Sequence, residues 1–327
     1  MADSRPGEFQ LIARHFAPLA RGFPGAFGLK HDIAVLSPPA GHELIVKTDA
    51  IVAGVHFPAD DPPGLIARKA LRVNLSDIAA GGGAPLAYQM ALALPPDWTE
   101  EWVAGFCAGL AVDQKAFSVH LCGGDTVSTP GPLMVSLTAF GTVPLGTAMG
   151  RSGATAGDGV WVSGTIGDAG LGLEVRRDAL PSVSPEEARY LLDRFRLPRP
   201  RLALAPVLRE IAHASIDISD GLVADLGHIC AASGVGAAIE ATAVPLSPPA
   251  RRLVGAEPPL LPRLMTAGDD YEILFTASND LRTGIEALAR PLGFPLTRLG
   301  RIVAGGSVSV LRFGVPLAID RGGFSHF

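Results

Sequence analysis

Two acidic residues at inward positions constrain this chain more than any other feature. Asp49 follows the apolar run Leu44–Val46, so we expect its carboxylate where a short strand ends. Asp77 recurs with Ala70 and Val73 at helical spacing, which predicts a place on an inward helix face. An ionised carboxylate on such a face is unfavourable unless a cation meets it. Two such acids on neighbouring elements indicate a metal ion.

Other acids of the chain also stand beside glycine or hydroxyl residues. They are Asp32, Asp125, Asp217 and Asp220, while Thr48 precedes Asp49. Carboxylates gathered in one site repel each other and take up protons unless divalent cations keep them ionised. Magnesium uses few carboxylates per ion, so acids spread over several loops suit a site with several ions. We interpret the set as a polyphosphate site with several Mg²⁺ ions.

Each acid also has a purely structural interpretation. Asp32 and Asp125 are expected at loop ends, where aspartate commonly forms Asx turns. Ser219 or Asp220 would cap a helix that continues through Leu222 and Leu226. His56 and Arg151, taken singly, fit a structural histidine and a surface charge. Only their joint occurrence favours a site, and the chain has no GxxxxGK[ST] loop that would offer another phosphate cradle.

Composition describes a globular protein of two domains. The chain has 327 residues, 48% of them hydrophobic and 18% charged, and a net charge of −5. This balance provides no basic surface for nucleic acid. The longest uncharged stretch, Thr126–Gly150, is interrupted by three prolines and reads as a buried strand with turns, so we expect no membrane segment. Three cysteines without CxxC spacing and no signal peptide predict a cytoplasmic protein.

Short apolar strands alternate with helical patterns, which indicates an α/β protein. We expect a buried strand at Ile33–Leu36, a helix from about Leu65 to Asp77, and a strand ending at Gly123-Gly124-Asp125. Ser184-Pro185-Glu186-Glu187 has the pattern of a capping box with proline at the first helical position. A linker at Pro144–Asp158 divides the chain into domains 1–146 and 147–327.

Several short motifs follow one another along essentially the whole chain in the order in which the thiamine-monophosphate kinases have them, and the chain resembles that family. CGGDT and IDISDGL also occur in the wider family of aminoimidazole-ribonucleotide and selenophosphate synthetases. Three further motifs are more specific to the kinases: KTDAIVAGVHF at 47–57, Gly268-Asp269-Asp270-Tyr271-Glu272, and the final Gly323-Phe324-Ser325-His326-Phe327. The resemblance implies a two-domain synthetase-like α/β fold and a homodimer in which the N-terminal sheets pair.

The same resemblance implies an activity and a set of roles. The activity is direct, in-line transfer of the ATP γ-phosphoryl group to thiamine monophosphate, which gives thiamine diphosphate and ADP. The N-terminal domain would bind ATP and Mg²⁺ and the C-terminal domain would complete the site. Implied Mg²⁺ ligands are Asp32, Thr48, Asp49, Asp77, Asp125, Asp217 and Asp220; ATP contacts are Gly124, Asp125, Arg151 and Ser219; thiamine monophosphate contacts are His56, Asp269 and Phe324.

Because the acceptor is itself a phosphate, the resemblance implies positioning and charge neutralisation without a strong general base. Three positions depart from the family pattern. His31 stands where an acid is usual, Lys47 where serine is frequent, and Asp269 where glutamate is common. A protonated lysine cannot bind magnesium. Two alternatives therefore stay open, namely a non-catalytic nucleotide or thiamine-phosphate binding protein and another ATP-dependent synthetase of the wider family.

Overall fold

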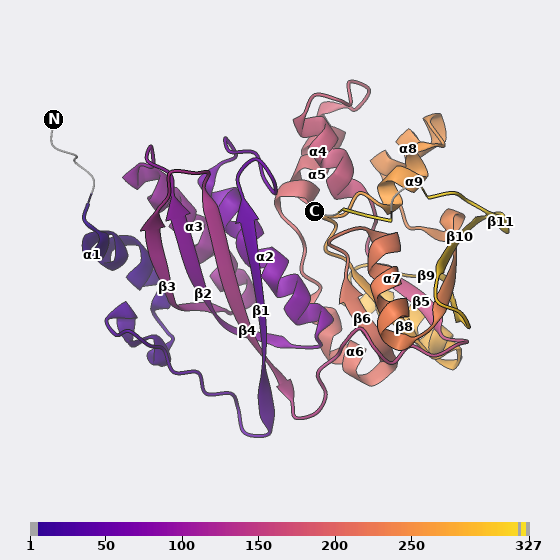
Figure 1. Cartoon of the computed structure of the whole chain (residues 1–327), viewed down its shortest axis with the longest axis horizontal. Coiled ribbons are helices and arrows are strands. Elements are labelled where there is room, and N and C mark those ends of the chain that lie inside the picture. The colour runs from indigo at the N-terminus through magenta and orange to yellow at the C-terminus, as the bar shows by residue number, and fades with distance from the viewer. Residues whose placement is uncertain (1–5, 320–321, 325–327) are drawn as a thin grey trace. The chain divides into compact units, whose positions relative to one another are not determined.

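The chain folds into two compact units in a computed structural model that describes residues 6–319 and 322–324. The first unit comprises the described residues up to Ile78 together with Gly83–Gly146. The second comprises Ala79–Gly82 and the described residues from Thr147 onward. Each unit has its own sheet and its own helices (Figure 1).

The first unit is built on a sheet that has four strands within the described residues, in the order β1-β4-β2-β3. Only β2 and β3 are parallel, and the other neighbours are antiparallel. The strands are β1 (His42–Val52), β2 (Ala84–Leu94), β3 (His120–Ser128) and β4 (Met134–Pro144). The α-helices are α1 (Glu8–Leu11), α2 (Pro63–Ala80) and α3 (Glu100–Phe117).

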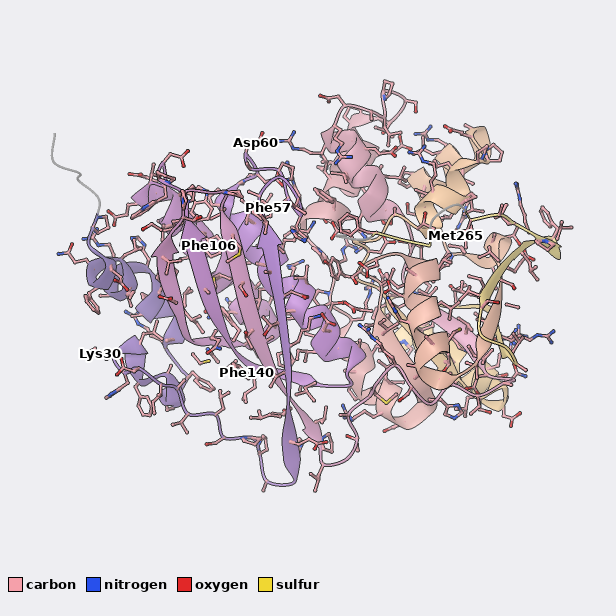
Figure 2. The ribbon with its side chains drawn as sticks, viewed as in Figure 1. Lys30, Phe57, Asp60, Phe106, Phe140 and Met265 are labelled. Atoms are coloured by element: carbon pink, nitrogen blue, oxygen red, sulfur yellow. The ribbon has the colours of Figure 1, made fainter. Side chains whose placement is uncertain are left out.

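Helices α2 and α3 lie against one face of this sheet (Figure 1). The alternation of strand side chains decides which residues meet them. In β1 the odd-numbered residues are the more buried, with Ile51 at 4% exposure, whereas Val46 on the other face is 60% exposed. Phe106 of α3 is fully buried (Figure 2). The Lys47 and Asp49 side chains therefore point to the helix-covered face, and the Thr48 side chain points away from it.

The second unit is built on a mixed sheet of seven strands among the described residues, in the order β11-β10-β7-β9-β5-β8-β6. Its strands are β5 (Gly159–Ser163), β6 (Ala212–Asp217), β7 (Gly236–Glu240), β8 (Ile273–Ala277), β9 (Leu296–Val303), β10 (Val308–Arg312) and β11 (Val315–Pro316). Its helices are α4 (Asp168–Arg176), α5 (Pro185–Arg196), α6 (Ala205–Ile211), α7 (Leu222–Ser233), α8 (Pro248–Ala256), α9 (Leu260–Met265) and α10 (Arg282–Leu292).

Both faces of this second sheet are buried. Val160 and Val162 of β5 belong to one apolar cluster with Leu226 of α7 and the fully buried Met265 (Figure 2). Trp161, between the two valines, belongs to a separate cluster on the other face. Strand β5 is apolar at consecutive positions because both of its faces are buried. The edge strand β6 ends at Asp217, and this end carries the acidic loop discussed below.

Several local predictions are confirmed. The helix predicted from Leu65 to Asp77 lies within α2, and α5 begins with the predicted capping box. The Ser184 hydroxyl accepts a hydrogen bond from the Glu187 N–H, and the Glu187 carboxylate accepts one from the Ser184 N–H. The two-domain α/β fold is also as predicted. No helix among the described residues is long and apolar enough to cross a membrane.

Three predictions about the surroundings of the acids are wrong. The segment Ile33–Leu36 forms no strand, and Ile33 is 68% exposed. Asp49 lies within β1 and Asp125 within β3, so neither follows a strand end. Both strands are longer than their apolar runs because backbone pairing with β4 and β2 continues through the polar residues.

The cap predicted for the helix after Asp220 is also wrong. Gly221 occupies the N-cap position of α7 and has no side chain that could cap the helix. The buried carboxylate of Asp225, one turn into the helix, accepts hydrogen bonds from the N–H groups of Ser219, Asp220 and Gly221 at 3.1, 3.1 and 3.2 Å. Asp225, which holds the loop Ser219–Gly221, therefore comes after that loop in the sequence.

Candidate functional site

In the first unit, Asp49 is held in place through its backbone. The buried amide of Asn74 on α2 accepts a hydrogen bond from the Asp49 N–H at 3.0 Å. The same amide donates to the Ala70 carbonyl at 3.0 Å, which fixes its orientation. A buried amide with both ends satisfied is a rigid link between β1 and α2. The Asp49 carboxylate is therefore free to point toward the end of α2 that carries Asp77.

Lys47 joins these two acids. Its Nζ lies 3.1 Å from Oδ1 of Asp49 and 3.2 Å from Oδ2 of Asp77. Burial by itself lowers the pKa of Lys47, but the charges of Asp77 and Asp49 outweigh this effect and raise the pKa above its ordinary value. The side chain is therefore an ammonium ion. The cation required by the two acids is supplied by the chain itself.

Thr48 and Asp125 lie apart from this pair within the first unit. The Thr48 hydroxyl is 2.8 Å from the Thr138 hydroxyl on the opposite sheet face. Asp49 shares a row across the sheet with Gly124, so Asp125 projects from the other face. Three strand spacings of about 4.8 Å put the two backbones about 14 Å apart. Asp125 is exposed, and its Oδ1 accepts from the Thr126 N–H at 2.8 Å.

Gly124 has a structural reason to be glycine. Its φ of +152° is in a region that L side chains rarely adopt, and a Cβ atom there would stand 2.0 Å from the Met90 carbonyl oxygen. Strand β2 thus comes too close to β3 for any side chain at this point. The exposed backbone of this segment is accessible to a ligand.

His56 is half-buried just beyond β1. Its Nδ1 accepts a hydrogen bond from the Val52 N–H at 3.0 Å, and its carbonyl accepts one from the Nζ of Lys69 at 3.1 Å. The acceptor role of Nδ1 puts any proton of the neutral ring on Nε2. Asp32 is exposed, in the segment between Lys30 and the unpaired Ile33. The structure fixes the His56 ring and leaves Asp32 at the surface.

In the second unit, the sequence-predicted residues gather at the end of β6. Asp217 is 3% exposed and Ser219 and Asp220 follow it. The N–H of Asp269 donates to the Ser219 carbonyl at 2.8 Å, and the N–H of Phe324 donates to the Asp220 carbonyl at 2.9 Å. Three distant parts of the sequence therefore meet in one loop cluster.

The backbone of this cluster is strained. Asp269 and Tyr271 have φ values of 63° and 51°, in the left-handed region that side chains disfavour. The hydrogen bond from the Tyr271 N–H to the Ile218 carbonyl, at 2.8 Å, holds this conformation. Such conformations cost on the order of 1–3 kcal/mol each, and they occur where a site requires them.

Asp220, Asp225 and His228 could hold a cation in the second unit. One potential ligand atom from each lies within 4.8 Å of the others. Burial, followed by the charge of Asp220, raises the pKa of Asp225 to about 7, whereas the three N–H donors lower it. A cation near this group would favour its ionised form. The sequence prediction included Asp220 and not the other two.

A buried network of ion pairs around Glu272 is linked to the loop that follows β6. Glu272, fully buried, accepts from Arg194 Nη2 at 2.9 Å, from Arg201 Nε at 2.6 Å and from Ser163 Oγ at 2.6 Å. Its carbonyl accepts from the Ile218 N–H at 2.8 Å. Arg151, by contrast, is exposed, and its neighbour Gly150 accepts from the Ser215 N–H of β6 at 2.8 Å.

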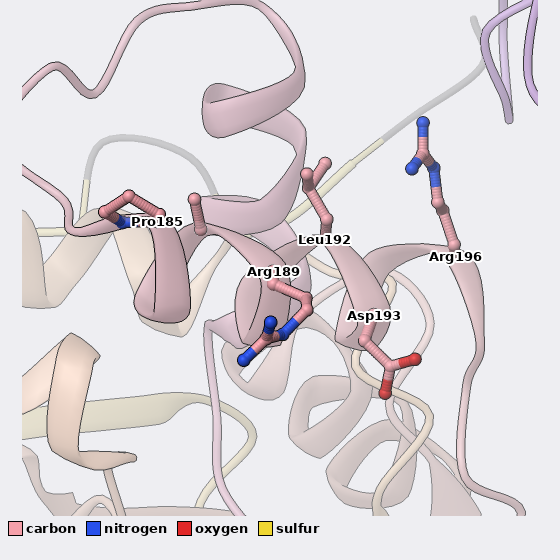
Figure 3. A pocket seen from close by; sticks show the side chains of 6 residues that line it. Pro185, Arg189, Leu192, Asp193 and Arg196 are labelled. Atoms are coloured by element: carbon pink, nitrogen blue, oxygen red, sulfur yellow. The ribbon is translucent and has the colours of Figure 1, made fainter.

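A separate hollow of about 350 Å³ lies along one face of α5 (Figure 3). Its lining includes Pro185, Arg189, Leu192, Asp193 and Arg196. Arg196 points away from Arg189 and Asp193 in this view. None of the sequence-predicted site residues lines it, so the hollow is distinct from the acidic loop cluster.

Sequence reasoning missed the residues that position the acids. Asn74, Lys69 and Asp225 each bind a backbone group of a predicted site residue. A signal for Asn74 was present, because it follows Ala70 by four residues and so shares its helix face. An amide on that face must find buried partners. Nothing in the sequence indicates what Asp225 binds, since its partners precede the helix.

Comparison with known proteins identifies the family of the chain. Residues 30–143 match the family "AIR synthase related protein, N-terminal domain", and residues 155–312 match the corresponding C-terminal domain. The thiamine-monophosphate kinase of Salmonella typhimurium is 39% identical over 98% of both chains. That of Caulobacter vibrioides is 39% identical over 99% of this chain and 92% of its own.

Solved structures of thiamine-monophosphate kinases have a similar fold. The thiamine-monophosphate kinase of Stenotrophomonas maltophilia has a TM-score of 0.84 at 40% identity and covers 93% of this chain and 96% of its own. AaThiL complexed with AMPPCP and TMP has a TM-score of 0.77 at 30% identity and covers 89% of both chains. Because relatives at this level of identity span nearly the whole sequence, the chain belongs to the thiamine-monophosphate kinase family, within the AIR synthase related proteins.

Proposed function

We propose that this protein transfers the γ-phosphoryl group of ATP to the phosphate of thiamine monophosphate, giving thiamine diphosphate and ADP. The observation that carries the proposal is the 39% identity to curated thiamine-monophosphate kinases over 98% of the chain. A relative that is 30% identical has been solved with AMPPCP and TMP, which supports both substrates. The transfer is direct and in line. A phosphate acceptor oxygen is already nucleophilic, so no residue is assigned as a strong general base.

The acids of both units are proposed to hold Mg²⁺. The set is Asp32, Thr48, Asp49, Asp77, Asp125, Asp217 and Asp220. Oxygen donors suit magnesium, and the buried Asp217 beside Asp220 fits this choice. When bound, Mg²⁺ offsets the charge of the two phosphate groups that must approach each other. Asp49 and Asp77 already hold the Lys47 ammonium between them, so this pair fits a shared magnesium ion poorly.

The chain's own residues are proposed to bind and orient the nucleotide. Gly124 and Asp125 would contact ATP from the first unit, and Arg151 and Ser219 from the second. The exposed guanidinium of Arg151 offers a positively charged, planar fork for phosphate oxygens. The Gly124 backbone can approach a phosphate closely because no side chain intervenes.

His56, Asp269 and Phe324 are proposed to bind thiamine monophosphate. The Phe324 ring is 51% exposed while its backbone is tied to Asp220, so an aromatic surface is presented at a fixed place. We expect Phe324→Ala to raise the KM for thiamine monophosphate about fivefold, since loss of one aromatic contact costs on the order of 1 kcal/mol. Steady-state kinetics with saturating ATP measure this change, and the KM for ATP is the internal control. An unaltered KM for thiamine monophosphate would remove Phe324 from the substrate site.

A homodimer is proposed in which the sheets of the first units pair. The face of β1 away from the helices leaves Leu44 36% and Val46 60% exposed. Exposed apolar side chains in a row on a strand suit a self-complementary interface. Light scattering on the purified protein should give twice the mass of one chain, and Val46→Asp should give a single-chain mass. A wild-type protein that is monomeric at micromolar concentration would rule this pairing out.

The decisive test is product formation by the purified protein. ATP, Mg²⁺ and thiamine monophosphate should yield ADP and thiamine diphosphate in equal amounts. Thiamine in place of its monophosphate, or EDTA with all other components, should yield neither product. Binding of thiamine monophosphate without ADP release would favour a non-catalytic binding protein. Neither binding nor turnover would turn attention to the substrates of the wider synthetase family.

A further inference from the structure

The contact of Lys47 with two acids gives this site a cation of its own. Lys47 and Asp49 are two residues apart in β1, so their side chains share the helix-covered face. Asp77 enters the same space from α2. The Lys47 Nζ therefore lies between two carboxylate oxygens that belong to different elements, at 3.1 and 3.2 Å.

A magnesium ion shared by Asp49 and Asp77 would need this same space. Mg²⁺ binds oxygen at about 2.0–2.1 Å in a strict octahedral arrangement. An ammonium group has three donors and no lone pair, so it cannot be a ligand. It would also repel a divalent ion placed a few ångström away. The lysine and a shared ion exclude each other in this geometry.

The surroundings also keep Lys47 where it is. The side chains of Lys47, Asp49 and Asp77 are 32%, 35% and 22% exposed, so all three are partly removed from water. The backbone of Asp49 is fixed by Asn74, and Asp77 lies in the last turn of a long helix. Both carboxylates are therefore positioned by the fold before any ligand arrives.

We propose that Lys47 is a built-in cation that takes the place of one divalent ion between Asp49 and Asp77. This inference rests on the proposed function, in which the acids of the chain hold Mg²⁺. It assigns Lys47 as a positioning residue that balances the charge of both carboxylates and holds them in place. A chain with a small neutral residue at this position would bind one more divalent ion.

The test counts Mn²⁺ ions bound per chain, by the electron paramagnetic resonance signal of free Mn²⁺, without nucleotide or substrate. Lys47→Ser should bind one more Mn²⁺ than the wild type. Lys47→Arg keeps the charge and should bind the wild-type number. Lys115→Ser makes the same charge change at an exposed position and should also leave the count unaltered. Adding Asp49→Asn to Lys47→Ser should remove the extra ion, which locates it.

Equal Mn²⁺ counts for the wild type and Lys47→Ser would overturn the proposal, whatever the number. So would an extra ion that persists when Asp49→Asn is added, because it would lie elsewhere. Circular dichroism of each variant verifies that the fold is retained. The count needs no turnover, so a protein without kinase activity could still support the role of Lys47. Conversely, an active kinase with equal counts would keep the proposed function and lose this inference.

Discussion

Replacing Asp49 by asparagine should lower kcat by about 10²–10³-fold while the protein stays folded. The change removes one charge from the space shared with Lys47 and Asp77 and keeps the size of the side chain. Groups that stabilise developing charge at an active site have effects of about this size. The Asp49 N–H still donates to Asn74, so β1 keeps its link to α2.

The measurement is kcat for ADP release at saturating ATP and thiamine monophosphate, with thermal unfolding as the readout of fold. Asp97→Asn is the matched control, because Asp97 belongs to the same unit, is exposed and undergoes the same change of charge. It should leave kcat within about twofold, as surface substitutions usually do little. An Asp49→Asn enzyme with near-normal kcat would exclude Asp49 from the reaction site.

Replacing Glu272 by glutamine should lower the free energy of unfolding by about 3 kcal/mol. Glu272 is fully buried, and its carboxylate accepts hydrogen bonds from the side chains of Arg194, Arg201 and Ser163. Removing the acid from a buried ion pair leaves uncompensated positive charge and typically costs about 3–5 kcal/mol. The NH₂ group of glutamine is a donor and would face the N–H donors of the arginines. At least one hydrogen bond is therefore lost.

Urea unfolding followed by circular dichroism measures this loss. Glu174→Gln is the control, because Glu174 also pairs with an arginine, Arg263, but at the surface. Exposed pairs contribute about 0–1 kcal/mol, so the control should change little. A loss below 1 kcal/mol for Glu272→Gln would mean that the arginines find other partners. Activity should fall as well, because the ion pairs of the side chain hold Glu272 in place, and its backbone carbonyl accepts a hydrogen bond from the Ile218 N–H next to Ser219.

The sequence could predict elements whose causes are local. Helix α5 begins at its capping box because two side chains and two N–H groups within four residues satisfy one another. Helix α2 follows from the spacing of Ala70, Val73 and Asp77. The acids beside glycine and hydroxyl residues are the basis on which a metal and phosphate site is proposed.

Prediction failed where pairing partners are distant in sequence. Strand β1 extends through Thr48 and Asp49 because its backbone pairs with β4, which follows some ninety residues later. Ile33–Leu36 has a strand-like composition, yet no ladder forms around it in the described structure. The loop before α7 is held by Asp225, whose position within the helix resembles that of any core-facing residue.

By itself, the sequence determined the two-domain α/β class and the family, because periodicity and short motifs are carried by neighbouring residues. Only the tertiary structure decided what each acid meets. Asp49 and Asp77 find the Nζ of Lys47, and Asp269 and Phe324 reach Ser219 and Asp220 through backbone hydrogen bonds. These contacts join residues that are far apart along the chain. Their geometry depends on sheet register and helix placement, which no local pattern specifies.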